Sequence, residues 1–429
     1  MTAIVGILNK HAIAIAADSA ATVFGNNNSH KIFNKSTKIF TLSKHHPVGV
    51  MIHNAGSFLS TPWETIIKVY RKNLKDKSFP TLKDYQEDFI TFLHKKNFYS
   101  DEATQKTFLY FLFNAVVKSL TEKALMNQTA ILADPTPENK AAAIALIDNE
   151  FEIFLRQIRS NSEICSEFVD LTLVDFNSFT HNEFSFIIKE FFTNNGLVAT
   201  PGLIVKIQET LYLYTRIKEE WVNHSGLVFV GFGEDEIYPS LIPVKISLAL
   251  GTRLRYFIKT NEEIHISNEK QSAISPFGQI DVIHTILTGV DNSLETTFIE
   301  NLGVTLEKYN QAIIGLVNGS PELMAQINAV DIPTLVEEYK TKIYEAKQVS
   351  YINPLYNALD SLSKEDLAEM AESLIYLTYL KRRITFAEES VGGPVDVAII
   401  SKGDGFIWTK RKLYFKPELN QYFFDNYLK

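Results

Sequence analysis

The sequence predicts an α/β protein, because segments that read as strands alternate with long segments that read as helices. The chain opens with strands and tight turns up to about residue 57, and helical signatures then run from about residue 62 to residue 221. Strands resume over 226–258, a second helical stretch reaches residue 384, and a hairpin follows. This order fits a sandwich of sheets and helices that longer helical segments interrupt.

The first strands are short and apolar. Residues 2–6 and 12–17 each form a continuous apolar run, which predicts two buried strands. The polar residues 26–30 and the segment Lys44–Pro47 read as turns. If the first two strands pair, Thr2 lies beside Asp18.

Helix starts are marked by caps and prolines. Thr61, Pro62 and Glu64 combine an N-cap, a proline at the first helical position and a capping-box glutamate, which predicts a helix over about 62–75. The same kinds of signal predict helices that begin near Thr81–Asp84 and that cover 101–126, 138–159, 182–193 and 203–221. Later elements are strands at 226–231, 240–248 and 252–258, helices from about 277 to 290 and onward to 384, and a hairpin around Gly403–Gly405.

Composition sets limits on function. The 429 residues, 45% of them apolar, supply enough chain for one large domain or two ordinary ones. A net charge of −8 argues against a general partner among nucleic acids or anionic membranes. A single cysteine, Cys165, excludes an internal disulfide and a cysteine-based zinc cluster. No long apolar run or signal-like opening segment is present, so a cytoplasmic protein is expected.

No metal or other cofactor is predicted. His45, His46 and His53 lie close together in the sequence, but no carboxylate or third histidine stands at ligand spacing. Loop and core positions are therefore the expected roles of these histidines.

Thr2 is the strongest candidate nucleophile. Once Met1 is removed, Thr2 becomes the first residue and carries a free α-amino group with a pKa of roughly 7.7–8.0. That group can accept the proton of the same residue's hydroxyl, so a threonine at the chain terminus brings its own general base.

The opening segment resembles that of proteasome β-subunits and of the related bacterial ATP-dependent protease peptidases, which are N-terminal-nucleophile hydrolases. Their mature chain starts with threonine, and a turn of the type Asp-Ser-Arg-Ala-Thr follows at the spacing of Asp18–Thr22 here. A lysine before a short apolar strand matches Lys38, and a strand that ends in a glycine turn matches Gly49–Ser57. A long helix followed by a Ser-Gly-Gly-like strand pair matches Lys364–Ile384 and the segment after it.

The resemblance implies a four-layer αββα sandwich with two antiparallel sheets and a helical layer on each outer face. We assign this core to residues 1–80, 222–290 and 360–412. Residues 81–221 and 291–359 are then two helical insertions without a parallel in the family. Residues 413–429 form an aromatic C-terminal tail that is expected to pack on its own domain.

The resemblance also implies catalytic roles. The ammonium of Lys38 would lie near the Thr2 hydroxyl and lower the cost of forming an alkoxide-like oxygen. Asp18 would pair with Lys38 and keep it charged. Lys31, which also precedes an Ile-Phe pair, is the alternative to Lys38. Gly56 is the candidate for the oxyanion hole, since a glycine lets its backbone N–H approach a substrate oxygen.

Further residues take binding or supporting roles by the same resemblance. The backbone of Ser19, Ala21 and Thr22 would form the edge that pairs with an extended peptide. Glu388 and Ser390 would take the places of the family's supporting acid and serine, which precede the Gly-Gly pair. The family's serine itself aligns with Val391, which has no hydroxyl, and its arginine after the Asp-Ser pair aligns with Ala20.

These features predict a threonine-type peptidase or amidohydrolase that cleaves peptide or amide bonds through an acyl-enzyme on Thr2. A homo-oligomer is expected, with an unfoldase or regulatory protein as a further partner.

Two alternatives stay open. The chain could be an amidase for a small amide, or a non-catalytic scaffold that binds partners, as Val391 and Ala20 would allow. Retention of Met1 would exclude both enzyme readings.

Overall fold

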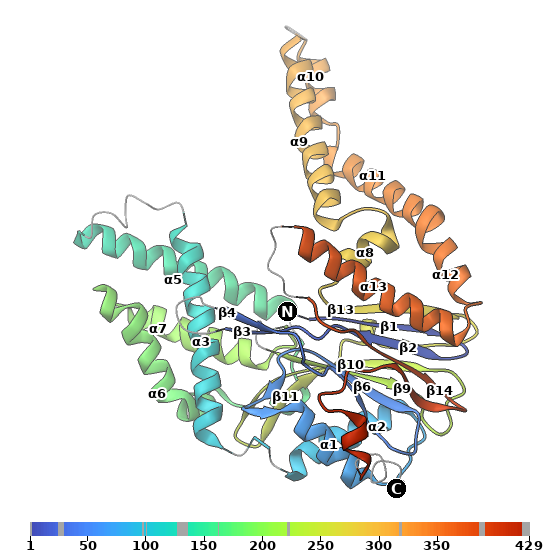
Figure 1. Ribbon diagram of the computed structural model, residues 1–429. Helices are drawn as coiled ribbons and strands as arrows, with labels where there is room; N and C mark the ends of the chain where they lie inside the picture. The colour runs from blue at the N-terminus through green and yellow to red at the C-terminus, as the bar shows by residue number, and fades with distance from the viewer. Residues whose placement is uncertain are drawn as a thin grey trace.

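The computed structural model describes residues 2–24, 30–96, 98–99, 101–126, 136–161, 163–220, 224–316, 320–385 and 391–422. Two antiparallel sheets lie at its centre, and helices surround them (Figure 1). The molecule is thus a mixed protein with antiparallel sheets, as the sequence predicts at this coarse level. In the described part of the chain, no helix is both long and apolar enough to cross a membrane.

The first sheet has five strands in the order β13-β1-β2-β14-β15. Their bounds are Ser272–Gly278 (β13), Ala3–Asn9 (β1), Ile13–Ala17 (β2), Asp396–Ser401 (β14) and Gly405–Lys410 (β15). The second sheet has the order β11-β10-β9-β6-β5, and β12 also pairs with β10. Its bounds are Arg253–Phe257 (β11), Ser240–Leu250 (β10), Ser225–Gly231 (β9), Val48–Asn54 (β6), Ile39–Thr41 (β5) and Ile264–His265 (β12). Two small ladders join Ala21–Phe24 (β3) to His30–Phe33 (β4), and Ser57–Phe58 (β7) to Thr61–Pro62 (β8).

The helices of the first half are α1 (Trp63–Leu74), α2 (Leu82–Lys96), α3 (Glu102–Leu125), α5 (Pro137–Asn161), α6 (Leu173–Phe191) and α7 (Pro201–Arg216). Those of the second half are α8 (Asp281–Thr288), α9 (Asn292–Leu316), α10 (Pro321–Asn328), α11 (Ile332–Lys347), α12 (Asn353–Leu359) and α13 (Lys364–Ile384). A π-helical turn, Gln348–Ile352, joins α11 to α12. In Figure 1, α3 and α5–α7 lie to one side of the sheets, and α9–α11 project beyond them.

Apolar side chains hold these parts together in four clusters. One cluster lies between the two sheets and joins residues such as Ile4 and Ile15 to Met51 and Val228. A second packs α1 and α2 on the outer face of the second sheet, and a third packs α8, α12 and α13 on the outer face of the first. The fourth is the separate core of α3 and α5–α7, which β10 and β11 extend. The sheets are therefore covered on their outer faces and packed against each other on their inner faces.

The predicted pairing of the first two strands is present. β1 and β2 run antiparallel with Ile4 opposite Ala17, and every residue of both strands is buried. The N–H of Asp18 donates to the carbonyl of Ala3 over 3.1 Å, so the ladder continues to the residue where Asp18 leaves the strand. The start of β1 and the end of β2 thus lie side by side.

The structure corrects three predictions about elements. β13 was not predicted as a strand, and the helix predicted from about 277 begins only at Asp281, after this strand. Pro276 lies inside β13, which stands at a sheet edge, where a proline without an N–H is tolerated. The helix predicted over 62–75 is present as α1, but Thr61 and Pro62 pair with β7, so that Pro62 rather than Thr61 is the N-cap. Proline has no side-chain acceptor, so this helix start has no side-chain cap. The helix predicted at 182–193 begins at Leu173, where Thr172 caps it.

Candidate active site around Asp18 and Lys38

Asp18 is the centre of a buried group of hydrogen bonds. Its Oδ1 accepts from the Lys38 ammonium at 2.6 Å and from the N–H of Ala3 at 2.9 Å. Its Oδ2 accepts from the N–H groups of Ala20 at 3.0 Å and Gly392 at 3.1 Å. Because the Asp18 side chain is only 1% exposed, these four donors replace the water that an ionised carboxylate would otherwise bind.

Lys38 reaches this carboxylate from the segment just before β5. The N–H of Ile52 in β6 donates to the Lys38 carbonyl over 2.8 Å, which fixes its backbone against the second sheet. Lys38 is 4% exposed. Burial lowers the pKa of Lys38 from its ordinary value, while the charge of Asp18 and its hydrogen bond favour the ammonium form. The alternative, Lys31, is exposed in β4, with its ammonium over the ring of Phe33.

Thr2 precedes β1 at the same place. Lys38 Nζ and the N–H of Ala3 share the Asp18 Oδ1 atom, so the ammonium lies beside the peptide bond between Thr2 and Ala3. The carbonyl of Thr2 accepts from the N–H of Gln279 at 2.8 Å. Gly278, with φ of +80°, packs so closely that a Cβ there would lie 2.0 Å from the Thr2 oxygen. Thr2, Asp18 and Lys38, which the sequence singled out, therefore lie together.

The C-terminal end of β6 approaches the same region through His53. The imidazole of His53 stacks on Phe277 with ring centroids 5.4 Å apart, and Phe277 stands opposite Ile4 in the β1–β13 ladder. In the described part of the chain, neither ring nitrogen of His53 makes a hydrogen bond of good geometry, and an interaction with the neighbouring Asn54 side chain only partly opposes the lowering of its pKa. Burial, with a smaller contribution from nearby His224, lowers the pKa of His53 to about 4. His53 is thus a neutral imidazole near the candidate site, a feature that the sequence analysis missed.

Gly56 follows β6 in an exposed turn. Its carbonyl accepts from the N–H of Trp63 at 3.1 Å, and a Cβ added to Gly56 would meet nothing within 4 Å. Gly56 is also absent from the glycines with positive φ, whereas its non-glycine neighbours Asn54, Leu59 and Ser60 have φ of 61°, 41° and 74°. No packing or backbone requirement within the described chain therefore explains a glycine at this position.

The three residues expected to bind a peptide differ in their surroundings. Ser19 is buried: its N–H donates to the Gly392 carbonyl at 2.9 Å, its carbonyl accepts from Ser36 N at 3.0 Å, and its hydroxyl donates to the Pro394 carbonyl. Ser19 therefore ties chain segments together instead of offering an open edge. Ala21 and Thr22 are half-buried in β3, which pairs only with β4 among the described strands.

The segment after α13 contributes backbone groups to the site. Gly392 exchanges hydrogen bonds with Asp18 and Ser19, and Gly393 has φ of +76° and lies against Asn34, where a Cβ would approach the carbonyl to 2.7 Å. Val391 is buried in the apolar cluster under α13. Glu388 and Ser390 lie outside the described residues, as do residues 26–29 of the turn predicted at 26–30.

A second buried acid–lysine pair stands next to the first. Asp396 opens β14 opposite Ala17, the neighbour of Asp18, and it is 1% exposed. Its carboxylate accepts from the N–H of Lys412 at 2.8 Å and forms an ion pair with the Lys412 ammonium. The charge of Lys412 contributes to lowering the pKa of Lys38. Sequence reasoning had no signal for this pair, because the partners are joined only by the fold of the C-terminal segment.

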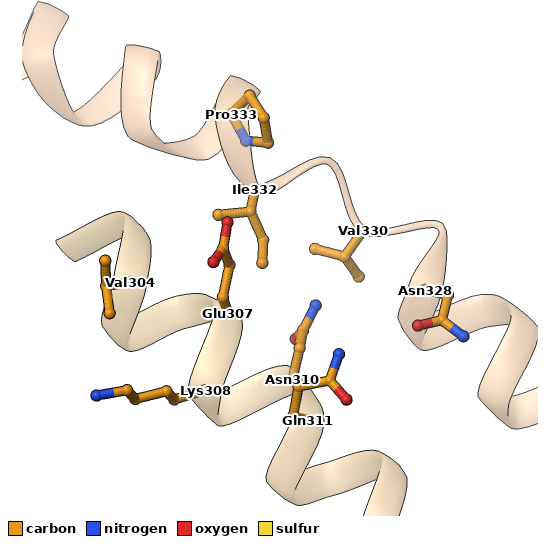
Figure 2. A pocket seen from close by; sticks show the side chains of 9 residues that line it. All are labelled: Val304, Glu307, Lys308, Asn310, Gln311, Asn328, Val330, Ile332 and Pro333. Carbon is orange, nitrogen blue, oxygen red and sulfur yellow. The ribbon is translucent and has the colours of Figure 1, made fainter. Parts of the chain in front are cut away.

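Two surface grooves are lined mainly by helix residues and, in one of them, also by strands β14 and β15. One, of about 560 Å³, lies between α9 and the connection from α10 to α11; in Figure 2 the side chains of Glu307 and Ile332 point toward one another across it. The other, of about 550 Å³, lies between α13 and the β14–β15 edge. Among the described residues, no group of three or more histidine, cysteine, aspartate and glutamate side chains could hold a metal ion.

Comparison of the chain with models of known protein families gives no match, and comparison with curated proteins gives no significant match. Function therefore has to be argued from the geometry and from the resemblance of the motifs.

Proposed function

We propose that this chain is a proteasome-like N-terminal threonine hydrolase that cleaves peptide or amide bonds once Met1 has been removed. The layer order supports the finer fold assignment: helices α8, α12 and α13, the first sheet, the second sheet, and helices α1 and α2 follow one another, as in an αββα sandwich. The proposal retains the cytoplasmic location that the sequence predicts.

The observation that carries the proposal is the shared Asp18 oxygen. A lysine ammonium buried at 4% exposure needs a compensating charge, and Asp18 supplies it. The same oxygen binds the N–H of Ala3, so the cation is held beside Thr2 and not elsewhere in the core. A buried charge pair of this kind is costly to keep for stability alone, and a chemical role accounts for its position.

The proposed reaction is acyl transfer in two steps. The Thr2 hydroxyl oxygen bonds to the substrate carbonyl carbon while its proton passes to the free α-amino group, which then protonates the leaving amine as the amide bond breaks. Water, deprotonated by the same amino group, attacks the ester and restores the hydroxyl. Lys38 would stabilise the oxygen of Thr2 by its charge, and the N–H of Gly56 would donate to the substrate oxyanion.

Intact mass of the natively produced protein tests this proposal, before and after incubation with a peptide epoxyketone, a reagent that reacts with N-terminal threonine. We expect a chain without Met1 that gains one inhibitor mass, and no gain in the Thr2→Ala variant. A mature Thr2 that ignores the inhibitor would favour an amidase for a small amide, which a panel of small amides would then identify.

One observation favours the non-catalytic alternative. Val391 stands where the family has a supporting serine, and here its side chain is buried among apolar residues under α13. A native chain that keeps Met1 would have a blocked amino group at Thr2. That result would reject the hydrolase and leave a partner-binding scaffold as the better assignment.

A further inference from the structure

The helices α9, α10 and α11 form an arm, described over residues 292–316 and 320–347, that projects from the body of the molecule (Figure 1). None of the three helices has a buried residue. α9 packs antiparallel against α11: Glu295 and Lys347 form an ion pair at 2.7 Å, and a Cβ on Gly303 would lie 3.8 Å from Val336. The arm thus has one internal seam and leaves its other faces open.

A second seam runs along the open side of α9. Its members recur at intervals of four and three residues, none is charged, and all are exposed: Leu294, Phe298, Asn301, Thr305, Tyr309, Ala312 and Leu316. Phe298 is 58% exposed, Tyr309 63% and Leu316 83%. Steps of three and four residues place these side chains on one face of the helix, as in helices that pack on one another.

α11 and the turn after it carry a matching seam. Leu335, Tyr339, Lys342, Ala346 and Val349 repeat the same intervals, are exposed, and include a single charge. With 3.6 residues per turn, each open seam lies roughly a third of a turn from the seam between α9 and α11. Because the two helices are antiparallel, both open seams turn to the same side of the arm. They form one nearly uncharged face.

We propose that this face binds the same face of a second copy of the chain, so that two arms build a four-helix bundle around a twofold axis. The area supports a dimer: α9 with 25 residues is about 37 Å long and α11 with 16 residues about 24 Å, so at about 10 Å width the two helices give a face of about 600 Å². Specific interfaces bury about 600–1,000 Å² per partner, and the face lies at the lower end of this range.

The composition of the face favours a second copy of the same chain as the partner. Asn301 and Thr305 interrupt the apolar seam near the middle of α9, and a polar pair at such a position fixes the register of two equal helices. A strongly charged partner would find only Lys342 to bind. Two-helix arms of equal length bury their apolar faces fully when they pair, as in antiparallel bundles. This contact would form whether or not Thr2 is a nucleophile.

Sedimentation velocity of the full chain over a concentration series tests the contact. We expect the double variant Phe298→Glu/Tyr309→Glu to have at most half the mass of the wild-type assembly, because each dimer would bury four added carboxylates. Val304→Glu is the matched control: Val304 is an exposed apolar residue of the same helix outside the seam. It should leave the mass unchanged.

Thiol labelling gives a second readout that does not depend on a disruptive charge. The thiol introduced by Tyr309→Cys should react with a maleimide several-fold more slowly at high protein concentration than at low. The thiol introduced by Val304→Cys should react at the same rate at both concentrations. The native Cys165 is buried and should not react with the maleimide at either protein concentration. A wild-type monomer at high concentration, or a double variant with the wild-type mass, would overturn the proposal.

Discussion

The Asp18 carboxylate accepts hydrogen bonds from four donors. It thereby connects the start of the chain near Thr2 to the segments that contain Lys38 and Gly392. In Asp18→Asn the Lys38 ammonium would stay buried without a counter-charge. We expect the free energy of unfolding to fall by about 3–5 kcal/mol, measured by urea denaturation.

The exposed pair Glu64–Lys68 on α1 provides the control for that substitution. Glu64→Gln removes one carboxylate charge at the surface and should change stability by no more than about 0.5 kcal/mol. Equal effects of the two variants would show that Asp18 does not carry the interactions described for it.

Gly56→Ala separates a structural glycine from a functional one. Because a Cβ at this position meets nothing within 4 Å, we expect the variant to unfold at the same midpoint urea concentration as the wild-type protein. If a substrate oxygen approaches the Gly56 N–H, the methyl group displaces it, and kcat/KM should fall by about 10²-fold. Gly403→Ala, also in open space, should change neither quantity. Wild-type activity in Gly56→Ala would remove Gly56 from the oxyanion hole.

His53 gives the molecule a specific response to acid. Its pKa is about 4 in the folded protein, below the 6.5 of an ordinary histidine. Between these values the unfolded chain binds a proton that the folded chain does not, so stability falls as the pH falls from about 6.5 to about 4. The loss reaches about 3 kcal/mol.

His53→Leu should remove this part of the acid dependence, and at pH 7 it should be neutral or stabilising, since no hydrogen bond of good geometry to the ring nitrogens is lost. Urea unfolding of both proteins at pH 7, 5.5 and 4.5 measures the difference. A variant that loses as much stability as the wild type over this range would mean that other groups carry the acid response.

At the scale of elements, β13 matters because it holds the start of β1. Gly278 in β13 has φ of +80° and lies against the Thr2 carbonyl. Gly278→Ala should cost about 2 kcal/mol or more, since an L-residue is strained at this φ and its Cβ would push Thr2 away. Gly56→Ala serves as the comparison for an unstrained glycine. Equal unfolding free energies for the two variants would contradict this role of Gly278.

Elements with a strong local pattern were predictable from the sequence, and those defined by distant contacts were not. The strands predicted over 2–6 and 12–17, which the structure has at 3–9 and 13–17, the helix after Pro62 and the hairpin around Gly403–Gly405 follow from apolar patterning and turn residues. β13 was not predicted because its partner strand lies about 270 residues away in the sequence, and Pro276 taken by itself argues against a strand.

The candidate site divides in the same way. The resemblance of short motifs singled out Thr2, Asp18 and Lys38, which lie together. The Asp396–Lys412 pair and the stacking of His53 on Phe277 depend on how strands β14, β6 and β13 are ordered in the sheets. Residue types alone carry no information about that order.

At the scale of the whole molecule, the arm and the body differ in how much they bury. Every residue of β1 and β2 is buried, whereas α9–α11 have no buried residue. Local opening is governed by buried apolar contacts. In the monomeric Phe298→Glu/Tyr309→Glu variant, we therefore expect the amides of the arm to exchange with deuterium much faster than those of β1 and β2.

Hydrogen exchange followed by mass spectrometry measures this contrast peptide by peptide. In the wild-type protein at high concentration, the arm should gain protection while β1 and β2 stay unchanged, because pairing of two arms supplies the apolar contacts that one arm lacks. Arm amides that are as protected as the sheet in the monomeric variant would mean that α9–α11 are stable alone. The exposed seam would then need no partner to hold the arm together, and the reason for expecting a second copy there would be lost.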